Sequence, residues 1–209
     1  MFIVTTTTFE KSWAELKQAV ADGSIREVLH SKDKIPVTLK NGEKTAVIAT
    51  YDESGKLFFV FDNCLRDPYY MNPRFTNGGA WAGSKMREYM KKIYDMLPDD
   101  LQAVIETTHI VQTHNGNTYE SDDKLFLLSE EQVFGKCRYS DPETGVTQLD
   151  IFKTERDRVK EREGVGTEWW WLRSPYSGYS YGFVGVSTSG TVSTSYANSS
   201  YGVAPGFCI

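Results

Sequence analysis

The chain has 209 residues, of which 40% are hydrophobic and 13% are aromatic, and its formal charge at pH 7 is −5. This length and composition can bury a core, which argues against wholesale disorder. The acidic balance and the absence of a long Lys/Arg run argue against nucleic acid or an anionic membrane as the main partner. No apolar run approaches the length of a membrane span, so no membrane insertion is expected.

The cysteines and the first residues bear on the cellular compartment. Cys64, Cys137 and Cys208 lie far apart and show no metal-ligand spacing, which favours buried thiols in a reducing compartment over a disulfide scaffold. Residues 1–4 are followed by four threonines and lack the basic start and long apolar stretch of a signal peptide. We therefore expect cytoplasmic synthesis without a signal peptide, with association with a virion as one route out of the cell.

The order of the sequence patterns predicts an α+β fold: one domain over residues 1–209 with antiparallel sheets, two to four helices and a C-terminal β-hairpin region. The expected parts are an N-terminal helix (1–30), a β-meander (31–62), a helical and strand part (80–135) and a Ser/Tyr/Gly-rich β region (169–209). Ser12 and Glu15 form the capping box of the first helix, which we expect to end near Gly23. The strands of the meander are expected at 35–39, 45–51 and 56–61, separated by turn signals at 41–42 and 53–55.

The central part combines helical and strand patterns. A helix is expected to begin at Ser84 with a Met-rich apolar face, which we interpret as core, and a second helix at Pro98. Residues 124–128 predict a buried strand, which runs into a capping box at Ser129. Charged residues dominate from 138 to 168 and predict a long loop. Within it, residues 153–163 mix both signs of charge, and we interpret them as a solvated helix or linker.

The chain changes character after Arg173, because no Lys, Arg, His, Asp or Glu follows it. Residues 182–186 and 191–196 carry short β-patterns joined by Ser-Gly, which predicts a hairpin. The apolar ending predicts that residues 202–209 form a last strand docked in a sheet. Arg173 itself is expected to support the fold through carboxylate or carbonyl contacts.

Three tryptophans precede this region. Because side chains alternate along a strand, Trp169 and Trp171 are expected on one face and Trp170 on the other, with at least one of the faces in the core.

Groups that would carry out catalysis or bind a metal are not brought together by any motif. The spacing of His109 and His114 does not place two ligands on one helix face, and no nucleophile elbow, P-loop or dinucleotide fingerprint is present. Asp122 and Asp123 precede the expected buried strand, where a turn or cap role is the default. The sequence therefore predicts no catalytic residue, no metal and no cofactor, and it places an enzyme second among the function classes.

The C-terminal region has the composition of an antibody-type binding surface, in which Tyr gives rigid contact area and Ser, Asn and Gly give adaptable polar contacts. The candidate ligand-binding residues are Tyr176, Ser177, Tyr179, Ser180, Tyr181, Ser195, Tyr196, Asn198, Ser199 and Tyr201. The alternative is that they are ordinary solvent-facing strand residues beside a Val and Phe core. A flexible linker is disfavoured, because linkers lack regularly spaced apolar residues.

Several motifs in this chain resemble those of a known family. They are W-W-L-R-S-P (170–175), a V-x-x-x-G hairpin (186–190), G-V-x-P (202–205), W-x-x-S-x-M-R (81–87), the L-P helix break (97–98) and D-K-L-F-L-L-S (123–129). Together they resemble a domain of unknown function that is common in gut Firmicutes and their phages, over roughly residues 30–209. One departure is that Ala204 and Gly206 replace the Arg and the second Ala of the family's G-V-R-P-A ending.

The resemblance implies a C-type-lectin-like fold similar to the variable proteins of diversity-generating retroelements. In those systems a reverse transcriptase rewrites adenines, and mutated A-A-Y codons cannot encode Lys, Glu, Gln, Met or Trp; residues 174–209 contain none of the five. The calcium and carbohydrate motifs of animal lectins are absent, so the fold resemblance does not imply sugar binding.

These observations favour a non-catalytic ligand-binding or display protein whose C-terminal face recognises a protein or cell-surface ligand, in a phage-encoded and diversified form. Two alternatives remain: a structural component of a phage particle, or an enzyme of the formylglycine-generating branch of the fold, which would need a reactive cysteine. The sequence leaves the oligomeric state open.

Overall fold

A computed structural model describes residues 11–209, so the expectation about the first residues of the chain lies outside the described part. The helices are α1 Trp13–Ala21, α2 Ile25–Val28, α3 Lys85–Met96, α4 Asp99–Val104, α5 Glu130–Phe134 and α6 Glu155–Arg158. The strands are β1 Lys34–Thr38, β2 Lys44–Tyr51, β3 Leu57–Phe61, β4 Tyr69–Tyr70, β5 Thr108–His114, β6 Asn117–Asp123, β7 Lys160–Arg162, β8 Gly166–Glu168, β9 Trp170–Pro175, β10 Gly182–Val186, β11 Val192–Tyr196, β12 Ser200–Tyr201 and β13 Gly206–Phe207. The fold is therefore mixed α+β. The six helices in residues 11–209 exceed the expected two to four, because helices as short as α2 and α6 leave no periodic pattern in a sequence.

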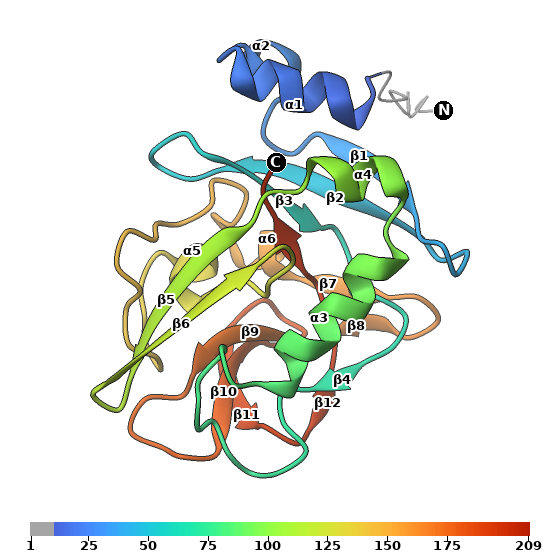
Figure 1. The fold of residues 1–209 in the computed structure, drawn as a ribbon. Coiled ribbons are helices and arrows are strands. Elements are labelled where there is room, and N and C mark those ends of the chain that lie inside the picture. The colour runs from blue at the N-terminus through green and yellow to red at the C-terminus, as the bar shows by residue number, and fades with distance from the viewer. Residues whose placement is uncertain (1–10) are drawn as a thin grey trace.

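The first helix begins as predicted. The Ser12 hydroxyl accepts from the Glu15 backbone N–H, and the Glu15 carboxylate accepts from the Ser12 N–H, which completes the capping box. Trp13 packs edge-on against Phe59, with ring centroids 5.2 Å apart, and so ties α1 to the sheet below it (Figure 1).

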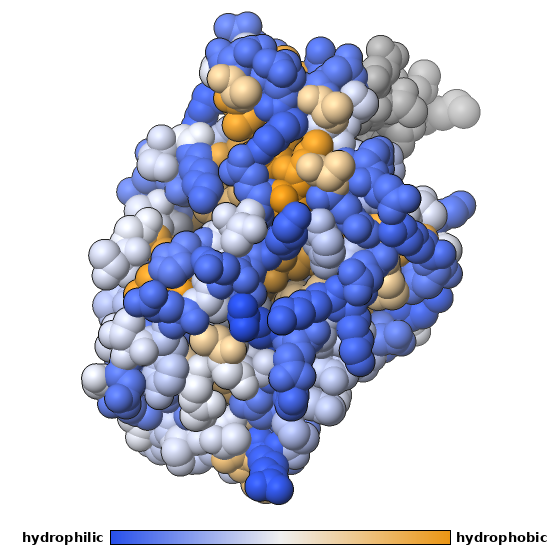
Figure 2. Space-filling view, in the orientation of Figure 1, coloured by the Kyte–Doolittle hydropathy of each residue, from blue (hydrophilic) through white to orange (hydrophobic). Residues whose placement is uncertain are grey.

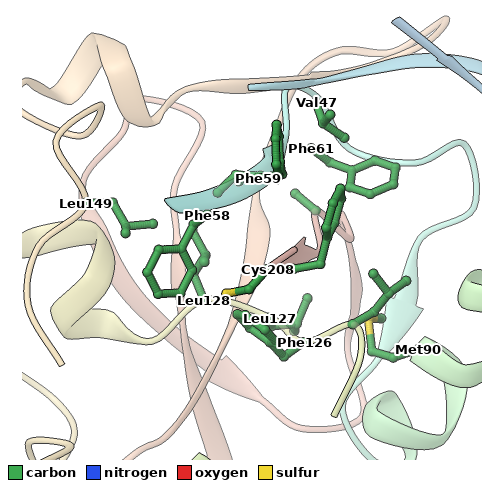
Figure 3. Packing of buried hydrophobic residues seen from close by; sticks show 14 of the residues in the cluster. Val47, Phe58, Phe59, Phe61, Met90, Phe126, Leu127, Leu128, Leu149 and Cys208 are labelled. Carbon is green, nitrogen blue, oxygen red and sulfur yellow. The ribbon is translucent and has the colours of Figure 1, made fainter. Parts of the chain in front are cut away.

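The predicted meander is confirmed as three strands of a four-stranded antiparallel sheet in the order β1-β2-β3-β13. The last strand comes from the C-terminus, where Phe207 pairs with Phe59 of β3. The expectation of a docked C-terminal strand is confirmed, although only two residues form it. Side chains of β3 and of segment 126–128 pack into the core beside this strand (Figure 3). That hydrophobic cluster runs from Trp13 to Ile209, while the single-domain interpretation stays a prediction.

The two central helices and the second capping box also follow the sequence. Ser84 caps α3 by accepting from the Arg87 N–H, and the Met-rich face of α3 lies in the core. Pro98 is the N-cap residue of α4. Ser129 and Gln132 form the predicted box on α5, which ends at Gly135 in the left-handed conformation that favours glycine.

The segment around Asp123 differs from expectation. Residues 108–123 form a long hairpin, β5–β6, that the sequence did not indicate beyond its polar turn. Asp123 is buried, where it accepts hydrogen bonds from the Trp81 indole (2.9 Å) and the Arg87 guanidinium (2.6 Å). Its expected turn or cap role is therefore wrong, and Asp123 instead joins the hairpin to the start of α3. The predicted strand at 124–128 is also wrong: the segment is largely buried, but only Phe126 makes a bridge, to Gly206.

The charged segment is more ordered than predicted. Instead of a long loop, residues 138–168 include α6 and the small hairpin β7–β8. The interpretation of residues 153–163 as solvated fails at Lys160, which is 2% exposed. Its ammonium donates to the carbonyls of Phe61 and Asp62 and lies 5.2 Å from the centre of the Trp170 ring.

Lys160 gives a pH-dependent contribution to stability. Burial lowers the pKa of its ammonium from 10.5 to about 8 in the native state. Between these values the unfolded chain binds a proton that the native chain does not, so this contribution to stability rises with pH and is least favourable below pH 8. From about pH 7 to about pH 10, the wild type is expected to gain up to about 3 kcal/mol in free energy of unfolding relative to Lys160→Met. Urea titrations at both pH values measure the difference, with the exposed Lys153→Met as control; parallel pH curves for Lys160→Met and wild type would contradict it.

The C-terminal region forms a second sheet in the order β11-β10-β9, so the predicted hairpin is confirmed (Figure 1). Trp169 and Trp171 lie together, with ring centroids 4.8 Å apart, whereas Trp170 faces Phe152, as the alternation predicts. Arg173 is buried and donates to the Glu143 carboxylate and the Leu127 carbonyl, which confirms its supporting role.

Candidate functional site

A continuous row of aromatic side chains lies along one side of the C-terminal sheet. Tyr176 stacks on Tyr179 at 4.4 Å between ring centroids, Tyr179 meets Tyr181 at 5.4 Å, and Tyr181 meets Tyr196 at 5.2 Å. Phe75 extends the row at the Tyr196 end (5.4 Å) and Tyr139 at the Tyr176 end (5.6 Å). We call these six residues the aromatic row: Tyr139, Tyr176, Tyr179, Tyr181, Tyr196 and Phe75.

The row is open to solvent although it is aromatic. Phe75 is 64% exposed, Tyr196 54% and Tyr179 46%. Beyond Arg173 the chain carries no charged side chain, and much of the lower surface in Figure 2 is correspondingly pale instead of deep blue. Exposed aromatic side chains that touch one another mark a surface suited to an interaction, in contrast to single scattered apolar residues.

The predicted polar residues fall into two groups. Ser180 and Asn198 are exposed near the row, and Ser199 closes the turn after β11 by donating its N–H to the Tyr196 carbonyl (2.9 Å). Ser195 forms the second group: its hydroxyl donates to the Tyr201 hydroxyl and so points away from the row.

Tyr201 packs on the Trp169 ring at 4.2 Å, which places it in a tryptophan cluster that supports the sheet and outside the row.

Asn77 holds the loop that carries half of the row. Its side-chain amide donates to three carbonyl groups, those of Tyr176 (3.2 Å), Tyr179 (2.8 Å) and Gly182 (2.9 Å). Its backbone N–H donates to the Ser180 carbonyl. One buried side chain therefore fixes the path of residues 176–182, and with it the positions of Tyr176 and Tyr179.

A buried histidine supports Asn77 in turn. The His114 Nε2 atom lies 3.1 Å from the Asn77 Oδ1 atom and 3.0 Å from the Asn115 side-chain amide nitrogen, so this ring nitrogen links the two asparagines. Burial lowers the pKa of His114, with Asp141 opposing the shift, and so favours the neutral form of the ring.

The start of the loop is also fixed by the segment before α6. The Ser177 N–H donates to the Tyr139 carbonyl (2.7 Å), and the Ser177 hydroxyl donates to the Asp141 carboxylate (2.7 Å). Ser177, predicted to contact ligand, thus has its hydroxyl engaged within the protein, and it positions the loop.

Sequence reasoning missed Phe75, Asn77 and Tyr139. The first two lie in an irregular segment between β4 and α3, and Tyr139 lies in the charged segment that was expected to be a loop. A local pattern does not mark any of them, because each reaches the row only through tertiary structure.

The three cysteines are the nucleophiles that the enzyme alternative would require. Burial raises the pKa of Cys64 to about 12 and that of Cys137 to about 11, and burial also raises the pKa of Cys208. Cys64 borders a hollow of about 710 Å³ between the start of β2, the segment after β3 and the β7–β8 hairpin. Within residues 11–209, no group of three or more His, Cys, Asp or Glu residues is placed to hold a metal ion.

These shifts predict slow thiol chemistry, because the thiolate is the nucleophile. At neutral pH, iodoacetamide is expected to leave all three cysteines of the native chain unmodified over a time in which the urea-unfolded chain is fully alkylated. Mass spectrometry of tryptic peptides measures this site by site. Rapid alkylation of Cys64 in the native chain would contradict the prediction and would favour a reactive cysteine at the hollow.

Comparison with known families shows to which family the chain belongs. The model of a family described as a domain of unknown function, DUF6273, matches residues 54–209. The chain belongs to the DUF6273 family. No curated protein and no solved structure matches it.

The DUF6273 region contains the whole aromatic row together with Asn77 and His114. It begins just before β3, whereas the resemblance was expected from about residue 30. The strands β1 and β2 lie upstream of it yet pair in the same sheet as β3 and β13, so the DUF6273 core is completed by the preceding segment. No helix within the described residues is long and apolar enough to cross a membrane.

Proposed function

We propose that the chain is a non-catalytic ligand-binding protein whose aromatic row recognises a protein or cell-surface ligand. The observation that carries this proposal is the continuity of the row: six aromatic side chains touch in sequence, and three of them are strongly exposed. Tyrosine suits such a surface, because it offers a large rigid contact area and loses little conformational entropy on binding.

The frame beneath the row supports the same proposal. The hydrogen bonds of Asn77, together with those of Ser177, fix the 176–182 loop before any ligand arrives. Ordering a loop on binding costs free energy, so a loop that is already ordered binds more tightly for the same contacts.

Binding to cells tests the proposal. The probe is a panel of intact bacterial cells and purified cell-wall fractions, incubated with fluorescently labelled chain. The double variant Tyr179→Ser/Tyr196→Ser removes the exposed centre of the row, and we expect it to weaken binding at least tenfold, about 1.4 kcal/mol. Val165→Ser, an exposed apolar residue on the β7–β8 hairpin, is the matched control and should bind like the wild type.

Equal binding by the double variant and the wild type would overturn the proposal. Failure of the wild type to bind any cell or fraction would favour the first alternative, a structural component of a phage particle. The second alternative, an enzyme of the formylglycine-generating branch, requires a reactive cysteine, and the raised thiol pKa values described above weigh against it.

We also propose the finer expectations of the resemblance: a C-type-lectin-like scaffold and diversification of the C-terminal region. Small antiparallel sheets and the C-terminal hairpin beneath the row support the first. The absence of Lys, Glu, Gln, Met and Trp from residues 174–209 supports the second. Deep sequencing of this region in the source population tests it: changes confined to adenine positions beside a template repeat are expected, and an invariant region would rule diversification out.

A further inference from the structure

The edge of strand β11 is open, unlike the other sheet edges around it. β11 is the outer strand of the β11-β10-β9 sheet (Figure 1). The hydrogen bonds from the Ser187 N–H to the Thr191 carbonyl and from the Ala197 N–H to the Tyr181 carbonyl fix which residues face β10. Since antiparallel pairs alternate, the backbone groups of Val192, Thr194 and Tyr196 point away from β10.

Most of these outward groups are unpaired. Within residues 11–209, the N–H and carbonyl groups of Val192 and Thr194 have no hydrogen-bond partner, and at Tyr196 only the carbonyl has one, the Ser199 N–H. Unpaired backbone groups are rarely buried away from water, so this edge is accessible.

The other edges of the two larger sheets are guarded. On β1, Lys34 and Pro36 protect the edge, since Pro36 has no N–H to offer a further strand. On β13, Gly206 exchanges two hydrogen bonds with Phe126.

The outer edge of β9 is also covered, because Trp171 donates to the Gly202 carbonyl and Arg173 to the Leu128 carbonyl. No strand or segment pairs with the outer edge of β11 in the described part of the chain. Its sequence, Val-Ser-Thr-Ser-Tyr, contains no charged residue and no proline, and it pairs with β10 in regular register without a bulge. An unguarded edge of this kind is a template for another strand.

The sequence of β11 is complementary to itself. If two copies pair antiparallel with Thr194 at the centre, Thr194 faces Thr194, Ser193 faces Ser195 and Val192 faces Tyr196. Thr–Thr and aromatic–β-branched neighbours are favourable cross-strand pairs. The register also matches the hydrogen bonding, because it sets the outward residues of one copy opposite those of the other.

We propose that the β11 edge is a homodimer interface, occupied by β11 of a second copy of this chain. The two sheets then form one six-stranded sheet about a two-fold axis perpendicular to it. That axis keeps the same face of both sheets on one side but reverses the strand direction, so the two aromatic rows lie at opposite ends of the six-stranded sheet, with Tyr196 of each copy opposite Val192 of the other. The dimer therefore presents two separate copies of the row, which would raise avidity for a ligand with repeated epitopes.

Sedimentation and light scattering test the mass directly. Because a single strand pair with its flanking side chains is a small interface, we expect a mass that rises from one chain to two with concentration. Thr194→Pro removes an N–H that the monomer does not use, and should give one chain at every concentration. Thr194→Ala keeps the N–H and should still dimerise.

A disulfide pair fixes the register even if the proline variant fails to fold. Residues in a hydrogen-bonded antiparallel pair have Cα atoms about 5.5 Å apart, which suits a disulfide, so Thr194→Cys should form a covalent dimer under mild oxidation. Ser193→Cys, displaced by two residues from its own copy, lies beyond about 7 Å and should not. A wild type that stays monomeric without cross-linking of Thr194→Cys would overturn the proposal, as would a dimer that persists unchanged in a folded Thr194→Pro.

Discussion

Replacing Arg173 by methionine is expected to destabilise the chain by about 4 kcal/mol, because it leaves the Glu143 carboxylate buried without a cation. In the wild type the Arg173 guanidinium makes a bidentate contact with Glu143 and also donates to the Leu127 carbonyl and the Gln132 side chain, each at 2.8 Å. These contacts join β9 to α5 and to the segment before β7. Chemical denaturation monitored by tryptophan fluorescence measures the change.

The double variant Arg173→Met/Glu143→Gln is the control for this interpretation. It removes both charges, while the amide at position 143 can still pair with Gln112, which donates to Glu143 at 2.8 Å in the wild type. Since the main cost in the single variant is an unpaired buried charge, the double variant should be more stable than Arg173→Met alone. Additive losses from the two substitutions would show that Arg173 acts through packing, and not through its charge.

Local sequence signals predicted the elements that local forces determine. The capping boxes at Ser12 and Ser129, the start of α3 at Ser84 and the hairpin β10–β11 all depend on residues within a few positions of one another. The docking of the C-terminus was predicted because an apolar chain end is rarely left in solvent.

The β5–β6 hairpin was missed because its inner face is partly polar. In β5 the inward residues are Ile110, Gln112 and His114, so the apolar alternation that marks a half-buried strand is absent. Gln112 is instead satisfied by hydrogen bonds to the Trp81 N–H and the Glu143 carboxylate. Lys160 was misplaced for the same reason: carbonyl groups distant in sequence compensate for the burial of its charge.

The candidate site was predicted in part. Four tyrosines of the row were predicted because they lie in one region whose composition is typical of binding surfaces: Tyr176, Tyr179, Tyr181 and Tyr196. Their role in binding stays a prediction. Composition also included Tyr201, which the fold places against Trp169. Asn77 was invisible, because nothing in its neighbourhood indicates that three carbonyl groups about a hundred residues away will converge on it.

Asn77 is therefore expected to contribute both to the stability of the fold and to the proposed binding. Asn77→Ala is expected to lower the free energy of unfolding by about 3 kcal/mol, since it removes one hydrogen-bond donor from each of three buried or half-buried carbonyl groups and one of the two partners of the His114 Nε2 atom. It should also release the loop that carries Tyr176 and Tyr179, so that cell binding falls even at temperatures where the variant remains folded.

Two comparisons separate this positioning role from general destabilisation. Asn198→Ala, an exposed asparagine beside the row, should leave stability within about 0.5 kcal/mol of the wild type. Hydrogen exchange should show faster exchange in Asn77→Ala for the amides of residues 176–181, with the amides paired between β10 and β11, such as those of Ser193 and Ser195, still protected. Uniformly faster exchange across the C-terminal sheet would mean that Asn77 stabilises the domain as a whole and does not set the geometry of the row.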